Sequence, residues 1–170
     1  MRYGTRTECK KRWMIQGKRP VCRMKIGYNW GYLYVALAPA TGDLFSMFFT
    51  HLNKDCFQVF LQKFEKHLET KGIDGKILLI GDGATAHTSQ NWNQIPQMDW
   101  KRQPTACPEV NPVERFFQEL RKPISNQIFD TEEQIREYLR KILLKIEPLK
   151  YSIKKLTLFP YIKNAISNSF

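Results

Sequence analysis

The run Lys76–Ile80, with the sequence KILLI, constrains the fold more than any other segment of the chain. Four consecutive apolar residues leave neither face of a strand polar, which is typical of a strand buried in a parallel arrangement. Such a strand needs helices to cover it, so we expect a mixed α/β layer with helices packed on a sheet. A chain of 170 residues suits one domain with a core of its own.

Three further segments before this run have the composition of strands. Residues 21–28, 31–38 and 43–50 are rich in β-branched and aromatic residues. The turn Pro39–Gly42 joins the last two, so Tyr32–Thr50 is predicted to be an antiparallel hairpin. One more short strand is expected at Met98–Arg102, before a loop.

The other segments have helical spacing. Asn53 is a predicted N-cap, apolar residues follow at helical intervals, and Gly72 ends the helix. Asn111, Pro112 and Glu114 make a second helix start, with Asn as N-cap, Pro at the first position and Glu at the third. Two more helical segments are expected: Glu132–Ile146, which ends before Pro148, and Tyr151–Ser167, which Pro160 interrupts.

Positive charge is concentrated at the start of the chain. The chain has 27 Lys and Arg against 16 Asp and Glu, and residues 1–25 hold nine of the basic residues with one acid. Nucleic-acid phosphate is the polyanion that best matches this pattern; a solvated tail, an acidic protein or an anionic membrane are the alternatives. The predicted DNA-binding residues are Arg2, Arg6, Lys10, Lys11, Arg12, Lys18, Arg19, Lys101 and Arg102.

Several classes of protein are disfavoured by composition. No apolar run reaches the ~18–20 residues that cross a bilayer, and the start of the chain lacks the apolar core of a secretory signal. The four cysteines are widely spaced and form no C-x-x-C pair, so we expect a reducing cytosol. Three histidines with these cysteines have no spacing that supports a zinc site.

Two carboxylates stand where chemistry is commonly placed. Asp82 directly follows the buried strand between two glycines, and Glu114 lies in the first turn of a capped helix. Converging carboxylates suit Mg²⁺ or Mn²⁺, which prefer oxygen ligands. Each residue also has an ordinary explanation, Asp82 as a turn former and Glu114 as a capping partner, and residue types alone leave both interpretations open.

The strings LLIGDGATAHTSQ and ACPEVNPVERFFQELRK resemble the catalytic blocks of mariner-like DDE-superfamily insertion-sequence transposases. The resemblance covers roughly residues 1–147 and implies a ribonuclease-H-like mixed sheet flanked by helices. It implies that Asp82 and Glu114 are catalytic metal ligands for Mg²⁺ or Mn²⁺, supported by His87, Asn111 and Pro112. The implied partners are DNA and a second copy in a homodimer, with no membrane, no small-molecule cofactor and a prokaryotic, nucleoid-associated cytoplasmic location.

The sequence departs from the family pattern in three places. Gly83 stands where the family usually has Asn, and the loop before Asn111 is slightly short. The family's first catalytic Asp lies just upstream of a segment like Arg2-Tyr3-Gly4, so that Asp and part of the first strand are expected to be missing or truncated here. Two metal ions would then lack a ligand, and we expect impaired activity.

We therefore expect a DNA transposase catalytic domain that cleaves DNA and transfers strands. The division expected is a basic segment at 1–25, a catalytic core at 26–147 and a helical tail at 148–170. A catalytically dead nucleic-acid-binding remnant is the first alternative. Another ribonuclease-H-like nuclease, acting on Holliday junctions or RNA strands, is the second.

Overall fold

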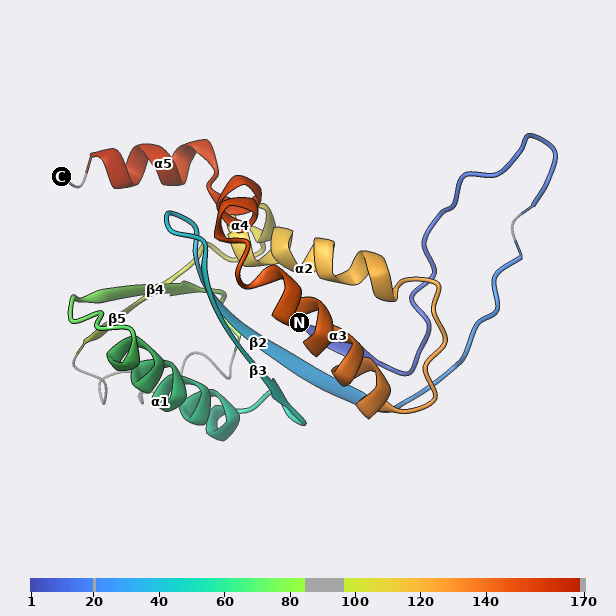
Figure 1. Ribbon diagram of the computed structural model, residues 1–170, viewed down its shortest axis with the longest axis horizontal. Coiled ribbons are helices and arrows are strands. Elements are labelled where there is room, and N and C mark those ends of the chain that lie inside the picture. The colour runs from blue at the N-terminus through green and yellow to red at the C-terminus, as the bar shows by residue number, and fades with distance from the viewer. Residues whose placement is uncertain (20, 85–96, 169–170) are drawn as a thin grey trace.

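The structure, a computed structural model, describes residues 1–19, 21–84 and 97–168. Its strands are β1 (Arg2–Gly4), β2 (Trp30–Ala38), β3 (Asp43–Phe49), β4 (Ile77–Gly81) and β5 (Met98–Arg102). Its helices are α1 (Lys54–Thr70), α2 (Pro112–Ile124), α3 (Glu132–Ile146), α4 (Lys150–Thr157) and α5 (Pro160–Ser167), with a 3₁₀ turn at Pro108–Val110. The expected mixed α/β fold is confirmed (Figure 1).

The predicted hairpin is present and lies at the centre of the molecule. β2 and β3 pair antiparallel, with Tyr32 opposite Phe49 at one end and Ala38 opposite Asp43 at the other. Gly42 in the turn has a φ of +78°. A Cβ on Gly42 would overlap the backbone of Lys150, so the turn needs glycine both for its φ and for its contact with α4.

The hairpin separates two apolar clusters because its side chains alternate between faces. Leu33 and Leu44 lie in one cluster with Tyr3 and the apolar faces of α2, α3 and α4. Tyr34 lies in the other cluster with α1 and Met98 of β5. The sheet is thus covered by helices on both faces (Figure 1).

The helices begin and end close to their predicted positions. Asn53 caps α1, accepting a hydrogen bond from the amide of Cys56 at 2.8 Å. The apolar residues that follow it at helical intervals are buried: Phe57, Phe60, Leu61, Phe64 and Leu68. Thr131 caps α3, whose bounds are those expected. Pro123 lies in α2, which ends one residue later at Ile124.

The sheet differs from the expectation because it is divided. β1 is a short strand that pairs antiparallel with β2, and β4 pairs in parallel with β5 in a second sheet. The first strand is therefore short rather than absent, and no described strand joins the two sheets by hydrogen bonds. The backbone of Met1 extends the pairing, with hydrogen bonds to Leu33 at 2.6 and 2.8 Å.

Burial of β4 on both faces was a wrong expectation. Ile77 and Leu79 pack against the α1 cluster, but Leu78 and Ile80 are 58% and 54% exposed. The apolar run does form a strand in a parallel pair. The elements that the structure describes cover one face of this pair and leave the other open.

The strand predicted at residues 21–28 was also wrong. Most of this segment belongs to an extended loop, the basic loop (residues 8–26), which projects from the body of the molecule (Figure 1). Two backbone hydrogen bonds, Thr5 to Asn29 and Thr7 to Lys25, both at 3.0 Å, close its base. The apolar residues of 21–28 are mostly exposed, because nothing described packs beside them.

Candidate active site

Asp82 lies at the carboxyl end of β4, where parallel strands commonly present functional groups. Its side chain is exposed and accepts a hydrogen bond from the amide of Ala84 at 3.2 Å. This local bond fixes the turn that follows the strand. The strand itself is anchored by Ile77 and Leu79, which pack in the cluster around α1, so the backbone that leads to Asp82 is held in a fixed position.

Glu114 is held by the start of α2. Asn111 accepts a hydrogen bond from the amide of Val113 at 3.0 Å, and Pro112 occupies the first helical position. Phe116 and Leu120, on the same helix, are almost completely buried under the hairpin. These contacts fix the helix, so the half-buried Glu114 carboxylate projects from a rigid element.

The negative charges of Asp82 and Glu114 both influence the amino group of Met1. Burial lowers the pKa of this amino group from 8.0 to about 5, while the negative charges of Glu114 and Asp82 oppose that shift and Arg121 adds to it. Asp82 and Glu114 come from different elements, 32 positions apart in the sequence. Both carboxylates nevertheless influence the pKa of the same amino group at the beginning of β1.

Arg102 brings a positive charge to the edge of the sheet where Asp82 lies. Its guanidinium lies over Gly83, where any Cβ would overlap it, and Trp100 covers Gly81 in the same way. Asp82 is therefore flanked by two glycines that side chains from β5 cover. Lys101, between them on β5, is exposed and pairs with Ile80 across the ladder.

The other predicted DNA-binding residues lie apart from this edge. Arg2 is on β1, with its guanidinium 4.5 Å from the ring centre of Trp30, and Arg6 follows it and is exposed. The rest are exposed on the basic loop: Lys10, Lys11, Arg12, Lys18 and Arg19. The structure thus separates the predicted basic residues into three groups: Lys101 and Arg102 beside Asp82, Arg2 and Arg6 at β1, and the residues on the loop.

The comparisons with known proteins address the family directly. A family model described as DDE superfamily endonuclease matches residues 1–136. This chain belongs to that family. No curated protein matches the sequence.

Solved structures with a similar fold come from transposases. The Mos1 transposase paired-end complex with left transposon end has a TM-score of 0.69 and 16% identity, covering 92% of this chain and 50% of that one. The Mos1 mariner paired end complex with Mn has a TM-score of 0.68 and 16% identity, covering 89% and 48%. The likeness confirms the ribonuclease-H-like α/β fold, and this DDE-family chain spans about half the length of those structures.

Other ligand groups predicted or considered give no further site in this DDE-family chain. His87 lies outside the described residues. His51 is exposed and hydrogen-bonded to Thr50, and no group of three or more His, Cys, Asp or Glu residues that could hold a metal occurs among residues 1–19, 21–84 and 97–168. No helix in the described part of the chain is long and apolar enough to cross a membrane.

Two residues that support this site, and the contact of a third, were missed at the sequence level. Asn126, with a φ of +60°, accepts from the backbone amide of Lys10 at 3.0 Å and donates to the carbonyl of Glu8 at 2.8 Å, which ties the basic loop to the end of α2. Tyr161 donates to the carbonyl of Val110, before the α2 cap. Gly83 was noted as a departure, but its contact with Arg102 joins separate strands and has no local sequence signal.

Proposed function

We propose that this chain is the catalytic region of a DNA transposase that cleaves and joins DNA phosphodiesters with divalent metal ions. The supporting observation is the match of residues 1–136 to the DDE superfamily endonuclease family, with Asp82 directly after β4 and Glu114 in the first turn of α2. Membership of the DDE superfamily endonucleases and a fold shared with Mos1 transposase complexes support DNA as the substrate. The proposal includes a cytoplasmic location and a homodimer.

The chemistry of the donor set fits Mg²⁺ or Mn²⁺. Two carboxylates supply hard oxygen ligands, and one of the similar Mos1 structures is a complex with Mn. Asp82 and Glu114 would hold the ion in this chain. A bound divalent ion would act as a Lewis acid on a phosphodiester and lower the pKa of a bound water.

The remaining residues of the site act on the DNA. Arg102 at Gly83 is placed to pair with a phosphate next to the carboxylates, since a guanidinium can donate two parallel hydrogen bonds to phosphate oxygens. Asn111 and Pro112 act indirectly, by fixing the first turn of α2 and hence Glu114. The basic loop provides phosphate contacts that do not depend on sequence.

We further propose that turnover is impaired, because the described residues contain no third acid clustered with this pair. The same observation favours the second candidate, a catalytically dead remnant that binds nucleic acid through its basic residues. Both candidates bind DNA, and only the first cleaves it.

A nicking and strand-transfer assay separates them. We expect weak Mg²⁺- or Mn²⁺-dependent cleavage of duplex DNA that Asp82→Ala or Glu114→Gln abolishes, while DNA binding is retained. Salt-dependent binding without any cleavage, unaffected by Asp82→Ala, would favour the remnant. Robust turnover that Asp82→Ala abolishes would contradict the impairment. Faster cleavage of Holliday junctions or RNA strands would instead assign another ribonuclease-H-like nuclease.

A further inference from the structure

The end of α3, together with α4 and α5, carries a second concentration of positive charge. Residues 140–163 contain seven basic residues and one acid, Glu147. Outside this segment and residues 1–25, the chain has 14 acidic against 11 basic residues. The seven basic residues are Arg140, Lys141, Lys145, Lys150, Lys154, Lys155 and Lys163.

Most of these charges are not neutralised within the molecule. All seven residues are exposed. Arg140 lies 3.6 Å from Glu137, and Lys150 lies 2.6 Å from Asp43. The other five have no ion-pair partner in the part of the chain that the structure describes: Lys141, Lys145, Lys154, Lys155 and Lys163. Clustered charges of one sign repel each other, and a polyanion would relieve that repulsion.

The helices that carry these lysines are attached beside the candidate active site. Ile153 and Thr157 form the buried face of α4, and Ile153 packs in the cluster that contains Phe116 and Leu120 of α2. Because residues three and four apart share a helix face, Lys154 and Lys155 lie away from this buried face. The solvent-facing surface of α4 is therefore basic.

Helix α5 touches the loop that leads to Glu114. The hydroxyl of Tyr161 donates to the carbonyl of Val110, which immediately precedes the α2 cap. Tyr151 and Tyr161, 78% and 46% exposed, accompany the lysines of α4 and α5. Exposed aromatic rings among basic residues are typical of surfaces that contact nucleic acid. The basic surface thus adjoins the helix start that presents a candidate metal ligand.

We propose that the C-terminal basic surface (Lys141, Lys145, Lys154, Lys155 and Lys163) binds the phosphate backbone of DNA. The inference rests on the proposed function, since it adds a second contact for the DNA engaged at Asp82 and Glu114. The DNA passes from the carboxylates over α4 and α5. An anionic membrane could also attract these lysines, but the contact between α5 and the loop before Glu114 favours the substrate of that site.

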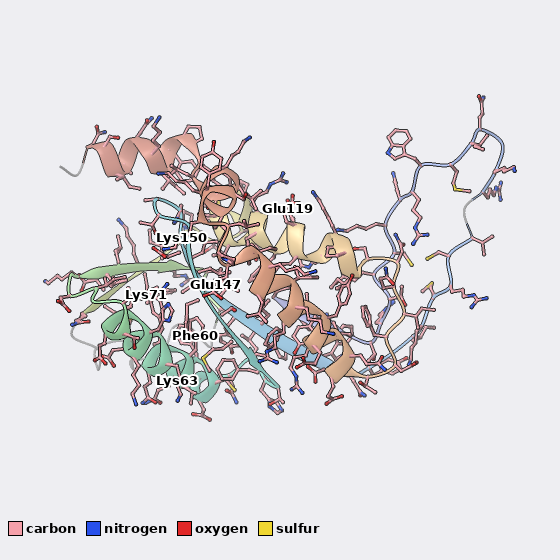
Figure 2. All side chains as sticks on the ribbon, viewed as in Figure 1. Phe60, Lys63, Lys71, Glu119, Glu147 and Lys150 are labelled. Atoms are coloured by element: carbon pink, nitrogen blue, oxygen red, sulfur yellow. The ribbon has the colours of Figure 1, made fainter. Side chains whose placement is uncertain are left out.

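The test compares two matched sets of three lysines. The test variant carries Lys154→Gln, Lys155→Gln and Lys163→Gln. The control variant carries Lys54→Gln, Lys63→Gln and Lys66→Gln, which are exposed on α1; Lys63 is labelled in Figure 2, on the opposite side of the molecule from α5. Both variants lose the same net charge. A difference in DNA affinity between them therefore depends on where the lysines lie and not on the overall charge.

Binding to labelled duplex DNA is measured without divalent ions, from about 50 to about 200 mM salt. For the test variant we expect the slope of log affinity against log salt to fall in magnitude by about 2 to 3, since each lost phosphate contact removes about 0.9. The control should change the slope by less than about 0.5. Replacing Lys154, Lys155 and Lys163 by Arg should keep the slope of the unmodified chain.

Equal slopes in the test and control variants would overturn the inference. So would loss of binding to phosphatidylcholine–phosphatidylserine vesicles by the test variant with unchanged DNA binding, which would assign the surface to membranes. Thermal unfolding of each variant checks that the fold is intact. The binding assay contains no divalent ion, whereas cleavage requires one. A negative result for the C-terminal basic surface can therefore be told apart from a negative result for the proposed metal-dependent cleavage.

Discussion

The carboxylates and the basic loop are held in opposite ways. Asp82 follows a strand that Ile77 and Leu79 anchor in one apolar cluster, and Glu114 projects from a helix whose Phe116 and Leu120 are buried in the other. The basic loop (residues 8–26) is exposed almost throughout, and its described contacts to the rest of the chain lie near its base, at Thr7, Lys25 and Asn126. Trp13 and Val21 are 102% and 92% exposed.

This difference matches the two tasks that we propose. Ligands for one metal ion must keep fixed relative positions, and only packed elements provide them. Phosphate binding through counterion release depends on the number of charges near the DNA and tolerates a movable support. The molecule therefore places its proposed chemistry on rigid elements and its proposed phosphate contacts on the loop and on exposed helix faces.

The largest contrast should come from removing apolar side chains in the two regions. Leu120→Ala creates a cavity beneath α2, where the side chain is completely buried, and should lower the free energy of unfolding by about 3 kcal/mol. Ile15→Ala, at a loop position that is 74% exposed, should change it by less than about 0.5 kcal/mol. Denaturant unfolding measures both, and similar losses would contradict the contrast.

A second prediction concerns charge on the basic loop. Replacing Lys10, Lys11 and Arg12 by Gln should weaken duplex DNA binding about tenfold at moderate salt, because up to three phosphate contacts are lost. The unfolding free energy and metal affinity should change little, because the side chain of Arg12 makes only a long hydrogen bond, 3.5 Å, to the carbonyl of Asn126, and the bond from Lys10 to Asn126 uses the backbone amide. Fluorescence anisotropy with labelled DNA measures the loss; unaltered DNA affinity would remove the loop from the proposed interface.

A third prediction tests how firmly Glu114 is held. Asn111→Ala removes the cap of α2 and should reduce stability by about 1 kcal/mol. Asn111→Asp keeps the acceptor oxygen and serves as the control. Calorimetric unfolding measures both variants. If Asn111→Ala were as stable as the unmodified chain, the cap would not be what fixes the first turn.

The smallest expected effect is the pH dependence of an ion pair far from the loop. Asp43 in the hairpin turn lies 2.6 Å from Lys150 and 3.6 Å from Lys71 (both labelled in Figure 2). The hydrogen bond from Lys150 is the main cause that lowers the pKa of Asp43 below its ordinary value of 3.8, with a further hydrogen bond from Thr41.

Because the folded-state pKa is the lower one, the unfolded chain binds the proton first as the pH falls. The stabilisation is therefore complete above pH 3.8 and is lost as the pH falls through the folded-state pKa. Asp43→Asn should cost less than about 1 kcal/mol at neutral pH, as expected for a partly exposed pair. Unfolding curves at several pH values test this; a difference that persists at strongly acid pH would contradict it.

Local patterns predicted most of the fold. The hairpin, the helix caps at Asn53 and Asn111, and the parallel arrangement of β4 were all recognisable from turn residues and periodicity. Burial was predicted less well. The apolar composition of KILLI does not reveal which of its faces another element covers, so the exposure of Leu78 and Ile80 could not be foreseen.

The candidate site has sequence signals for only some of its residues, for a similar reason. Asp82 and Glu114 each have a sequence signal, the end of a strand and a capped helix start. Contacts such as Arg102 on Gly83 or Tyr161 on Val110 depend on tertiary packing. The residues 21–28 have the composition of a strand, but a strand also needs a continuous partner, and the structure provides only isolated hydrogen bonds there.

Binding of Mn²⁺, followed by electron paramagnetic resonance, tests most directly whether Asp82 and Glu114 hold one ion. Asp82→Asn and Glu114→Gln should each lower the affinity at least about tenfold. The double variant should lose less than the sum of the two single free-energy losses, because both residues bind the same ion. Glu109→Gln, an exposed acid in the loop before α2, should leave the affinity unchanged. Unchanged affinity in either single variant, or strictly additive losses, would contradict a shared metal site.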